Sequence, residues 1–178
     1  DDDMTDISAS MLKEKDPSQL DVSNISAWIF DLDNTIYPAH QSLFPRVAVR
    51  MIDWIEQHFK LPRAQAEALK TRLFLEYGTT MNGLSSEYSI APEDFLSYVH
   101  DIDLSDISYD SELDEGISAL PGNKYIYTNG TVLHAERILD GFGIKHHFDL
   151  IFDIFASNHN PKPAMQPYQD FLAKSNIN

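Results

Sequence analysis

The feature that most constrains this chain is a short apolar run that ends abruptly in acidic residues. Residues 27–30 are Ala-Trp-Ile-Phe, and residues 31–35 are Asp-Leu-Asp-Asn-Thr. A run of this kind is typical of a buried strand, and in α/β folds ligands bind where such a strand passes into a polar loop. The pattern therefore predicts a sheet strand whose carboxyl end brings two acids into a ligand site.

Two further apolar runs repeat this arrangement later in the chain. Residues 124–127 precede the polar sequence Thr-Asn-Gly at 128–130, and residues 150–155 form the third run. Helical spacing of apolar residues at 132–139 lies between them and is followed by glycines. Strands that alternate with helices imply parallel strands joined by crossover connections. The predicted fold class is therefore α/β with a doubly wound parallel sheet.

The block between the first and second runs has a different pattern. Its apolar residues recur at helical spacing, which predicts helices at 43–59, 64–77, 92–100 and 111–120. The glycine- and polar-rich residues 78–88 are predicted to form a connecting loop. Such a block, inserted after the first strand, predicts a helical cap over the strand ends. The expected organisation is an acidic flexible tail at 1–24, a core at 25–38 and 120–178, and a cap at 39–119.

The two acids after the first strand have a spacing that suits phosphoryl chemistry. Asp31 and Asp33 are two residues apart, so their side chains can converge on one cavity. Two carboxylates offer the hard oxygen ligands that Mg²⁺ prefers, and Mg²⁺ is commonly shared with a substrate phosphate. One carboxylate can then attack phosphorus, while Asp33 is placed to act as acid and base. An isolated Asp-x-Asp pair also occurs in turns and caps, so the context of the strand carries the prediction.

Polar residues after the second strand, and a lysine near the end of the chain, complete the predicted site. Thr128 and Asn129 can donate hydroxyl, amide and backbone hydrogens to phosphoryl oxygens. Lys162 offers a positive charge where negative charge accumulates during transfer. Taken singly, each of these residues also fits a turn or a solvated surface.

Composition narrows the classes of partner. The net charge of −15 and the pI near 4.6 oppose binding to a nucleic acid polymer or an anionic membrane. A small phosphorylated metabolite stays possible, because one cation and one lysine can reverse the potential inside a cleft. The chain has no cysteine, which removes thiol chemistry, and no apolar run long enough to cross a bilayer. A cytoplasmic location is expected.

Three motifs in order give this chain a family resemblance. The strand followed by 31–35, the strand ending in Tyr-Thr-Asn-Gly at 127–130, and Pro-Lys-Pro at 161–163 resemble the first three motifs of the haloacid dehalogenase superfamily. The resemblance spans residues 27–178 and implies a Rossmann-like core, a Mg²⁺ cofactor and hydrolysis of a phosphate monoester. It implies that Asp31 is the nucleophile, that Asp33 is the acid/base residue, and that both bind the metal. It also implies a phosphate-binding set of Thr128, Asn129, Gly130 and Lys162.

Two stretches are similar to the pyrimidine 5'-nucleotidase branch of that superfamily. They are residues 76–84 in the predicted cap and residues 127–137 in the core. The resemblance implies a nucleoside 5'-monophosphate as substrate, and cap contacts from Tyr77, Thr79 and Thr80. Dehalogenation is disfavoured because Asp33 supplies a second acid that halide displacement does not use. A phosphomutase, which needs the same aspartates, remains open.

One departure from the superfamily pattern affects the metal site. The superfamily has a fourth motif, an acidic pair after a further strand, and the sequence reaches Asn178 before such a strand appears. We therefore expect a chain truncated before this motif, and the alternative function is a catalytically silent module that binds phosphate or metal weakly. Asp153 is not expected to replace the missing acids, because it is predicted to lie within the third strand.

The histidines and the acidic run suggest metal sites of a different kind. His146 and His147 are adjacent, and adjacent residues on a strand point to opposite faces. With no partner at ligand spacing, these two residues and His159 are predicted to be surface histidines. The acidic run at 101–114 is predicted to be a solvated loop and helix start.

Overall fold

A parallel three-stranded sheet forms the centre of the computed structural model, which describes residues 21–38, 41 and 43–177. The strand order is β1-β2-β3, with bounds Ala27–Phe30, Asn123–Tyr127 and Leu150–Phe152. Phe30 pairs with Ile126, and Tyr127 pairs with Phe152, so the carboxyl ends of all three strands meet at one edge. The predicted α/β class with a parallel sheet is confirmed.

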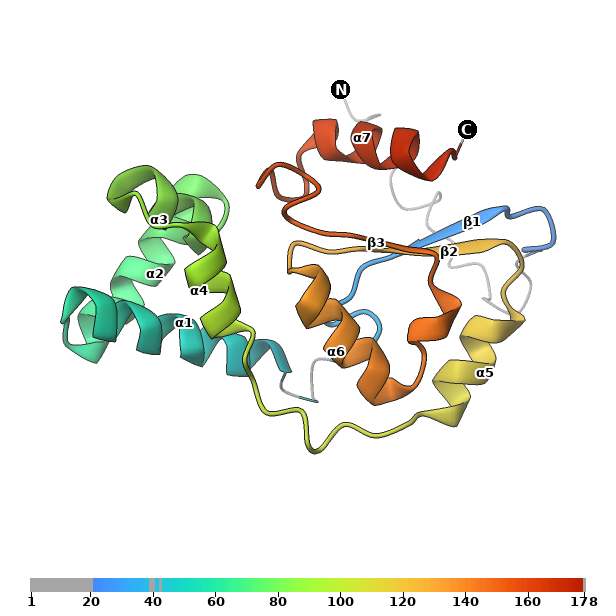
Figure 1. The fold of residues 1–178 in the computed structure, drawn as a ribbon, viewed down its shortest axis with the longest axis horizontal. Helices are drawn as coiled ribbons and strands as arrows, with labels where there is room; N and C mark the ends of the chain where they lie inside the picture. The colour runs from blue at the N-terminus through green and yellow to red at the C-terminus, as the bar shows by residue number, and fades with distance from the viewer. Residues whose placement is uncertain (1–20, 39–40, 42, 178) are drawn as a thin grey trace, which may run out of the picture.

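Helices cover both faces of the sheet (Figure 1). On one face, α5 (Ser111–Ala119) and α6 (Val132–Phe142) contribute to a buried cluster with the sheet residue Ile126. On the other face, α7 (Met165–Ser175) inserts Phe171 against Tyr127 and Phe152. Burial of these large side chains is the main favourable term that holds helices to a sheet. The helices packed on both faces therefore hold the ends of the strands in place.

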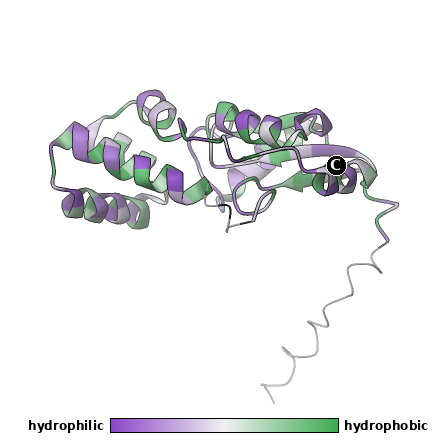
Figure 2. Ribbon diagram, turned by 90° about the horizontal axis from the view of Figure 1, so that it is seen from below, coloured by the Kyte–Doolittle hydropathy of each residue, from purple (hydrophilic) through white to green (hydrophobic). Residues whose placement is uncertain are grey.

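Four helices between β1 and β2 pack on one another beside the sheet (Figure 1). They bury their own apolar cluster, which includes Ile55, Leu73, Leu84 and Phe95. Figure 2 shows hydrophilic and hydrophobic residues alternating along these helices, as amphipathic packing requires. Their bounds are Leu43–Phe59 for α1, Arg63–Tyr77 for α2, Thr80–Tyr88 for α3 and Pro92–Val99 for α4.

The predicted loop at 78–88 is wrong, because most of it forms α3. Thr79 caps the helix by accepting a hydrogen bond from the backbone N–H of Asn82 at 3.0 Å. Gly83 lies so close to α2 that an added Cβ would be 2.6 Å from the Cβ of Leu73. The glycine that suggested a loop is therefore what allows two helices to pack closely.

Packing assigns α5 to the sheet. Its buried residue Ile117 belongs to the same cluster as Leu32 and Ile138, whereas the cap helices, apart from Leu43 at the start of α1, bury their residues in a separate cluster. We therefore propose that the cap ends in the segment 100–110 and not at residue 119. The predicted tail at 1–24 lies almost wholly outside the described residues. Within the described ranges, no helix is long and apolar enough to cross a membrane.

Candidate active site

Asp31 follows the last residue of β1 and is the most accessible acid at the strand ends. Its side chain is 46% exposed, and Lys162 Nζ donates to its Oδ1 at 2.6 Å. The hydroxyl of Thr35 lies 3.4 Å from Oδ2, which is a long contact. Asp31 therefore combines an ion pair with an open approach from solvent.

Lys162 connects three parts of the site. Its Nζ also donates to the backbone carbonyl of Tyr127 at 2.8 Å, and its backbone N–H donates to Asn129 Oδ1 at 2.8 Å. The ammonium lies 5.1 Å from the centre of the Tyr127 ring. These contacts fix the lysine between the ends of β1 and β2, so its charge stays beside Asp31. The structure thus brings together Asp31, Asn129 and Lys162, which the sequence predicted as one site.

Asp33 lies deeper than Asp31 and is surrounded by donors. The hydroxyl of Tyr37 donates to its Oδ1, and Nε2 of His134 lies 3.3 Å from the same oxygen. Burial by itself would raise the pKa of Asp33, but the hydrogen bonds and charge of its neighbours outweigh burial and lower that pKa. Burial and the carboxylate of Asp33 raise the pKa of Tyr37, so its hydroxyl remains a donor. Asp33 is therefore held as a carboxylate near neutral pH.

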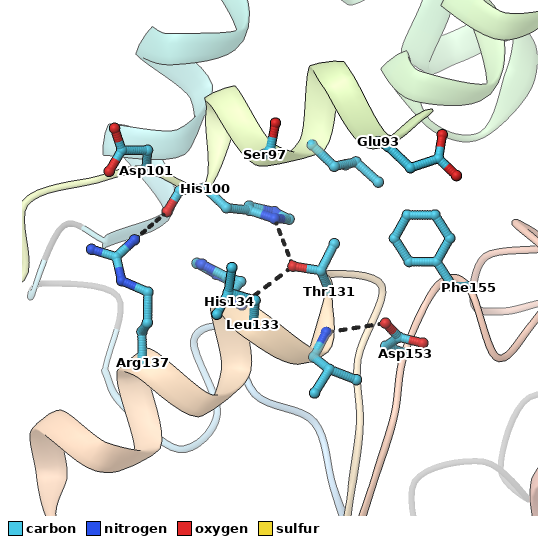
Figure 3. A pocket seen from close by; sticks show the side chains of 12 residues that line it. Glu93, Ser97, His100, Asp101, Thr131, Leu133, His134, Arg137, Asp153 and Phe155 are labelled. Carbon is cyan, nitrogen blue, oxygen red and sulfur yellow. Dashed lines mark hydrogen bonds between the residues drawn. The ribbon is translucent and has the colours of Figure 1, made fainter. Parts of the chain in front are cut away.

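Two stacked histidines close the site on the side of the cap (Figure 3). The ring of His134, on α6, lies 4.2 Å from the ring of His100, the residue that follows α4, with 17° between their planes. His100 Nδ1 pairs with the hydroxyl of Thr131 at 3.1 Å. Burial, and then the neighbouring His134, lower the pKa of His100 to about 3, so His100 is neutral. The ring of His100 therefore adds no charge where the cap meets the core.

A guanidinium reinforces the same junction. Arg137, one turn along α6 from His134, donates to the backbone carbonyls of His100 at 2.7 Å and Ile102 at 2.9 Å. The first bond satisfies the carbonyl of the residue that caps α4, where a helix leaves such groups without partners, and the second holds the chain just beyond the cap residue. The chain leaving the cap is therefore bound to the helix that carries His134.

The loop after β2 is tightly packed. Thr128 is buried, and its Oγ1 accepts a hydrogen bond from the backbone N–H of Gly130 at 3.0 Å. A Cβ at Gly130 would lie 3.2 Å from Cδ2 of His134 and 3.4 Å from Oγ1 of Thr128. A side chain at residue 130 would therefore crowd the ring of His134, which favours glycine at this position.

Asp153 immediately follows β3, and its predicted position within the third strand is wrong. The strand ends at Phe152, because the carboxylate of Asp153 turns back to bind backbone groups. Its Oδ2 accepts from the N–H of Val132 at 3.0 Å, and its Oδ1 accepts from the N–H of Ala156 at 2.9 Å. Both oxygens are used to cap the start of α6 and the loop after β3. This use is structural and is consistent with leaving Asp153 out of the predicted metal site.

The predicted cap residues have different surroundings. The turn that contains Tyr77 and Thr79 faces the core, because a Cβ at Gly78 would lie 3.7 Å from Cγ of Pro161, next to Lys162. Thr80 is buried, and its hydroxyl donates to the carbonyl of Lys70 at 3.2 Å inside the cap. The structure thus places the turn at 77–79 beside the loop that carries Lys162. The side chain of Thr80, in contrast, packs inside the cap.

A cavity of about 660 Å³ lies between the cap and α6 (Figure 3). Side chains of α4 form one wall, the start of α6 forms another, and the loop after β3 contributes a third. Its polar lining has both signs of charge, with Glu93, Asp101, Asp153 and Arg137. The cavity is large enough for a small organic ligand.

Sequence reasoning missed three members of the site. Tyr37, His100 and His134 all surround Asp33, yet each comes from a different segment. Tyr37 was detectable in principle, because it lies four residues after Asp33 in a short turn. The two histidines meet only when the cap folds over α6, and no local spacing signals that contact.

Two comparisons with known proteins give a family match and a similar solved structure. A family model described as a haloacid dehalogenase-like hydrolase matches residues 25–178. Among solved structures, the chain is similar to the putative HAD-hydrolase YfnB from Bacillus subtilis, which was crystallised bound to magnesium. That similarity has 17% identity, covers 84% of this chain and 72% of that one, and has a TM-score of 0.48. Because the family model covers most of its length, the chain belongs to the haloacid dehalogenase-like hydrolases.

Proposed function

We propose that this protein hydrolyses a phosphate monoester through a covalent intermediate on Asp31. The observation that carries the proposal is the contact of 2.6 Å between Asp31 and Lys162 at the strand ends, with Asp33 two residues further on. An accessible carboxylate beside a fixed ammonium can receive a phosphate dianion, whose charge a lone carboxylate would repel. The family membership supports a hydrolase, and the polar groups support phosphorus as the centre of attack.

The proposed reaction has two steps. A carboxylate oxygen of Asp31 attacks phosphorus, the bond from phosphorus to the alcohol oxygen breaks, and the leaving oxygen takes a proton from Asp33. Water then gives a proton back to Asp33 and attacks the acyl phosphate. This step releases inorganic phosphate and restores Asp31. Lys162 stabilises charge on the phosphoryl oxygens in both steps.

Asp33 must carry a proton in the first step, although its surroundings lower its pKa in the free protein. An incoming phosphate opposes that effect, because a nearby anion raises the pKa of a carboxyl group. Tyr37 and His134 hold the side chain in one orientation throughout. Substrate binding thus favours the protonated form of Asp33 that acid catalysis needs. In the second step the lowered pKa leaves Asp33 ionised, so it can accept a proton from water.

We propose Mg²⁺ as the cofactor. The carboxylates of Asp31 and Asp33 offer hard oxygen ligands, and the half-exposed side chain of Asp31 leaves space for the waters that Mg²⁺ retains. When bound, the ion would neutralise negative charge on the phosphate and on the attacking carboxylate. Asp31 is the stronger candidate ligand, because one oxygen of Asp33 is already engaged by Tyr37 and His134.

We further propose a pyrimidine nucleoside 5'-monophosphate as substrate and the cytoplasm as location. The sequence similarity at 76–84 and 127–137 supports this substrate class. The turn at 77–79 lies beside the loop that carries Lys162, where Tyr77 can stack on a base.

Phosphate release tests the proposal directly. The chain would be supplied with pyrimidine and purine nucleoside monophosphates and sugar phosphates, with Mg²⁺ or with a chelator. We expect release that depends on Mg²⁺ and is fastest with a pyrimidine nucleotide. Asp31→Asn should lower the rate by about 10³-fold or more, because it removes the nucleophile.

Asp140→Asn is a matched control, since Asp140 is an exposed acid on α6 whose ion pair with Lys145 is remote from the strand ends. Full activity in Asp31→Asn would rule out the covalent mechanism. If all esters were hydrolysed at equal rates, the protein would still be a phosphate monoester hydrolase, but the proposed nucleotide substrate would be wrong.

A further inference from the structure

The opposite edge of the sheet carries a second group of histidines and acid. His146 and His147 lie in a 3-10 turn, η3 (Lys145–His147), just before β3, so the strand geometry that the sequence argument used for them does not apply. Both rings therefore turn to the same side, with centres 4.0 Å apart. They face Asp114 of α5, a partner more than thirty residues away in sequence.

The three side chains present their ligand atoms to one point. His147 Nε2 lies 2.5 Å from Oδ1 of Asp114, and His146 Nε2 lies 3.6 Å from the same oxygen. The ligand atoms of all three residues lie within 4.8 Å of one another. Ligands bound tetrahedrally at about 2.0–2.2 Å from zinc are separated by roughly 3.3–3.6 Å. Small rotations of His147 and Asp114 would therefore bring the group to coordination distances.

The carboxylate is already oriented for this role. The hydroxyl of Tyr109 donates to Oδ2 of Asp114 at 2.7 Å, which leaves Oδ1 facing the imidazoles. Metal-binding carboxylates commonly have such a hydrogen-bonded support behind them. Glu115 also lines the same surface cavity of about 350 Å³ and adds negative charge.

We propose that Asp114, His146 and His147 form a binding site for a divalent transition-metal ion of the zinc type. Two imidazole nitrogens and one carboxylate oxygen suit zinc, cobalt, nickel or copper, whereas Mg²⁺ prefers oxygen ligands alone. On binding, the ion takes the place of the proton between His147 Nε2 and Asp114, and the neutral imidazole keeps its one ring proton on Nδ1. Water completes the coordination, because the cavity is open.

This site is separate from the proposed hydrolytic centre. η3 precedes β3, so the histidines lie at the amino end of that strand, whereas Asp31 follows the carboxyl end of β1. The bound ion would join α5 to the turn before β3. The expected role is structural, since a ligand that binds only the folded state stabilises that state.

Calorimetric titration of the purified chain with Zn²⁺ tests the proposal. We expect one binding event in the wild type, and at least about 100-fold weaker binding in His147→Asn and in Asp114→Asn, since each removes a ligand. His58→Asn is the control, because His58 is an exposed histidine on α1. Titration with Co²⁺ adds a visible absorption band that should disappear in the same variants.

Further variants keep the outcome decisive. Tyr109→Phe keeps every ligand and should weaken Zn²⁺ binding by about 10-fold, because Asp114 loses its support. Asp31→Asn should bind Zn²⁺ like the wild type, which separates this site from the proposed hydrolytic centre. Circular dichroism would confirm that each variant is folded. Equal Zn²⁺ affinity in wild type, His147→Asn and Asp114→Asn would overturn the proposal and leave an ordinary hydrogen-bonded pair.

Discussion

Two groups of side chains at opposite edges of the sheet have the same composition. Each has an aspartate, a tyrosine that donates its hydroxyl to that aspartate, and two histidines with adjacent rings, which are stacked in one group and tilted in the other. We call the group under the cap the enclosed cluster, formed by Asp33, Tyr37, His100 and His134. We call the other the open cluster, formed by Asp114, Tyr109, His146 and His147.

Enclosure and orientation distinguish the two clusters. The side chain of His134 is 3% exposed, whereas that of His146 is 64% exposed. In the enclosed cluster only His134 points a nitrogen at the aspartate, because His100 pairs with Thr131. In the open cluster both histidines point Nε2 at one oxygen. The same residue types therefore suit proton transfer in one place and metal binding in the other.

The largest expected effect comes from removing the acid of the enclosed cluster. Asp33→Asn should lower phosphate release by about 10²–10⁴-fold, because the amide can neither give a proton to the leaving oxygen nor take one from water. The measurement is the initial rate with a nucleoside monophosphate and with a monoester that has a better leaving group. The loss should shrink with the better leaving group, which depends less on acid catalysis.

Zinc binding shows whether the two clusters are independent. Asp33→Asn should leave the Zn²⁺ affinity of the open cluster within about twofold, since the aspartates lie at opposite edges of the sheet. Asp140→Asn again serves as the activity control. A parallel loss of Zn²⁺ binding and hydrolysis in Asp33→Asn would show that the division between the clusters is wrong.

Enclosure also predicts a dependence of stability on pH. The pKa of His100 is about 3 in the folded protein, against an ordinary value of 6.5. Between these values the unfolded chain binds a proton that the folded chain excludes, so stability falls as the pH drops from 6.5 towards 3. A depression of this size corresponds to about 3–5 kcal/mol over the whole range.

Replacing the imidazole ring of His100 isolates its contribution to the pH dependence of stability. His100→Phe keeps a ring that can stack on His134 but removes the titrating group, so its unfolding free energy should fall less steeply with acid. Urea unfolding between pH 7 and pH 4.5 measures the difference between the two proteins at each pH. His58→Phe is the control, because His58 is exposed and also stacks on an aromatic ring, Trp54. Parallel curves for wild type and His100→Phe would contradict the expected proton exclusion.

Much of the fold was predictable because its signals are local. The alternation of apolar runs and helical spacing predicted the parallel sheet, and α1 has the bounds expected from its apolar repeat. Asp31 and Asn129 were predictable as neighbours, because the ends of parallel strands meet at one edge, whereas Lys162 was predicted from its charge and from the family resemblance. Such features depend on periodicity and strand direction, which one sequence reveals.

The features that the sequence did not predict depend on contacts between segments far apart in the chain. The glycine of α3 was misinterpreted, because its close approach to Leu73 is a property of helix packing. The histidines of the open cluster were assigned to the surface because their partner lies on another helix, and a strand was assumed where a 3-10 turn forms. The stack of His100 on His134 likewise requires the folded cap.

The smallest expected effect concerns the helices that support the two clusters. Gly83 of α3 lies in the cap that encloses Asp33, and Gly116 lies on α5, which carries Asp114. A Cβ at Gly83 would lie 2.6 Å from the Cβ of buried Leu73, whereas a Cβ at Gly116 meets nothing within 4 Å. Overpacking of a core costs about 1–3 kcal/mol, which exceeds the gain of about 1 kcal/mol from alanine in a helix.

The two alanine variants should therefore change stability in opposite directions. Gly83→Ala should lower the unfolding free energy by about 1–2 kcal/mol, and Gly116→Ala should raise it by up to about 1 kcal/mol. Urea unfolding at neutral pH measures both. Because Gly83 supports the cap, its variant should also slow phosphate release, while Gly116→Ala should not. Stabilisation by alanine at both positions would contradict the close packing of α2 against α3, and with it the rigid enclosure of Asp33 by the cap.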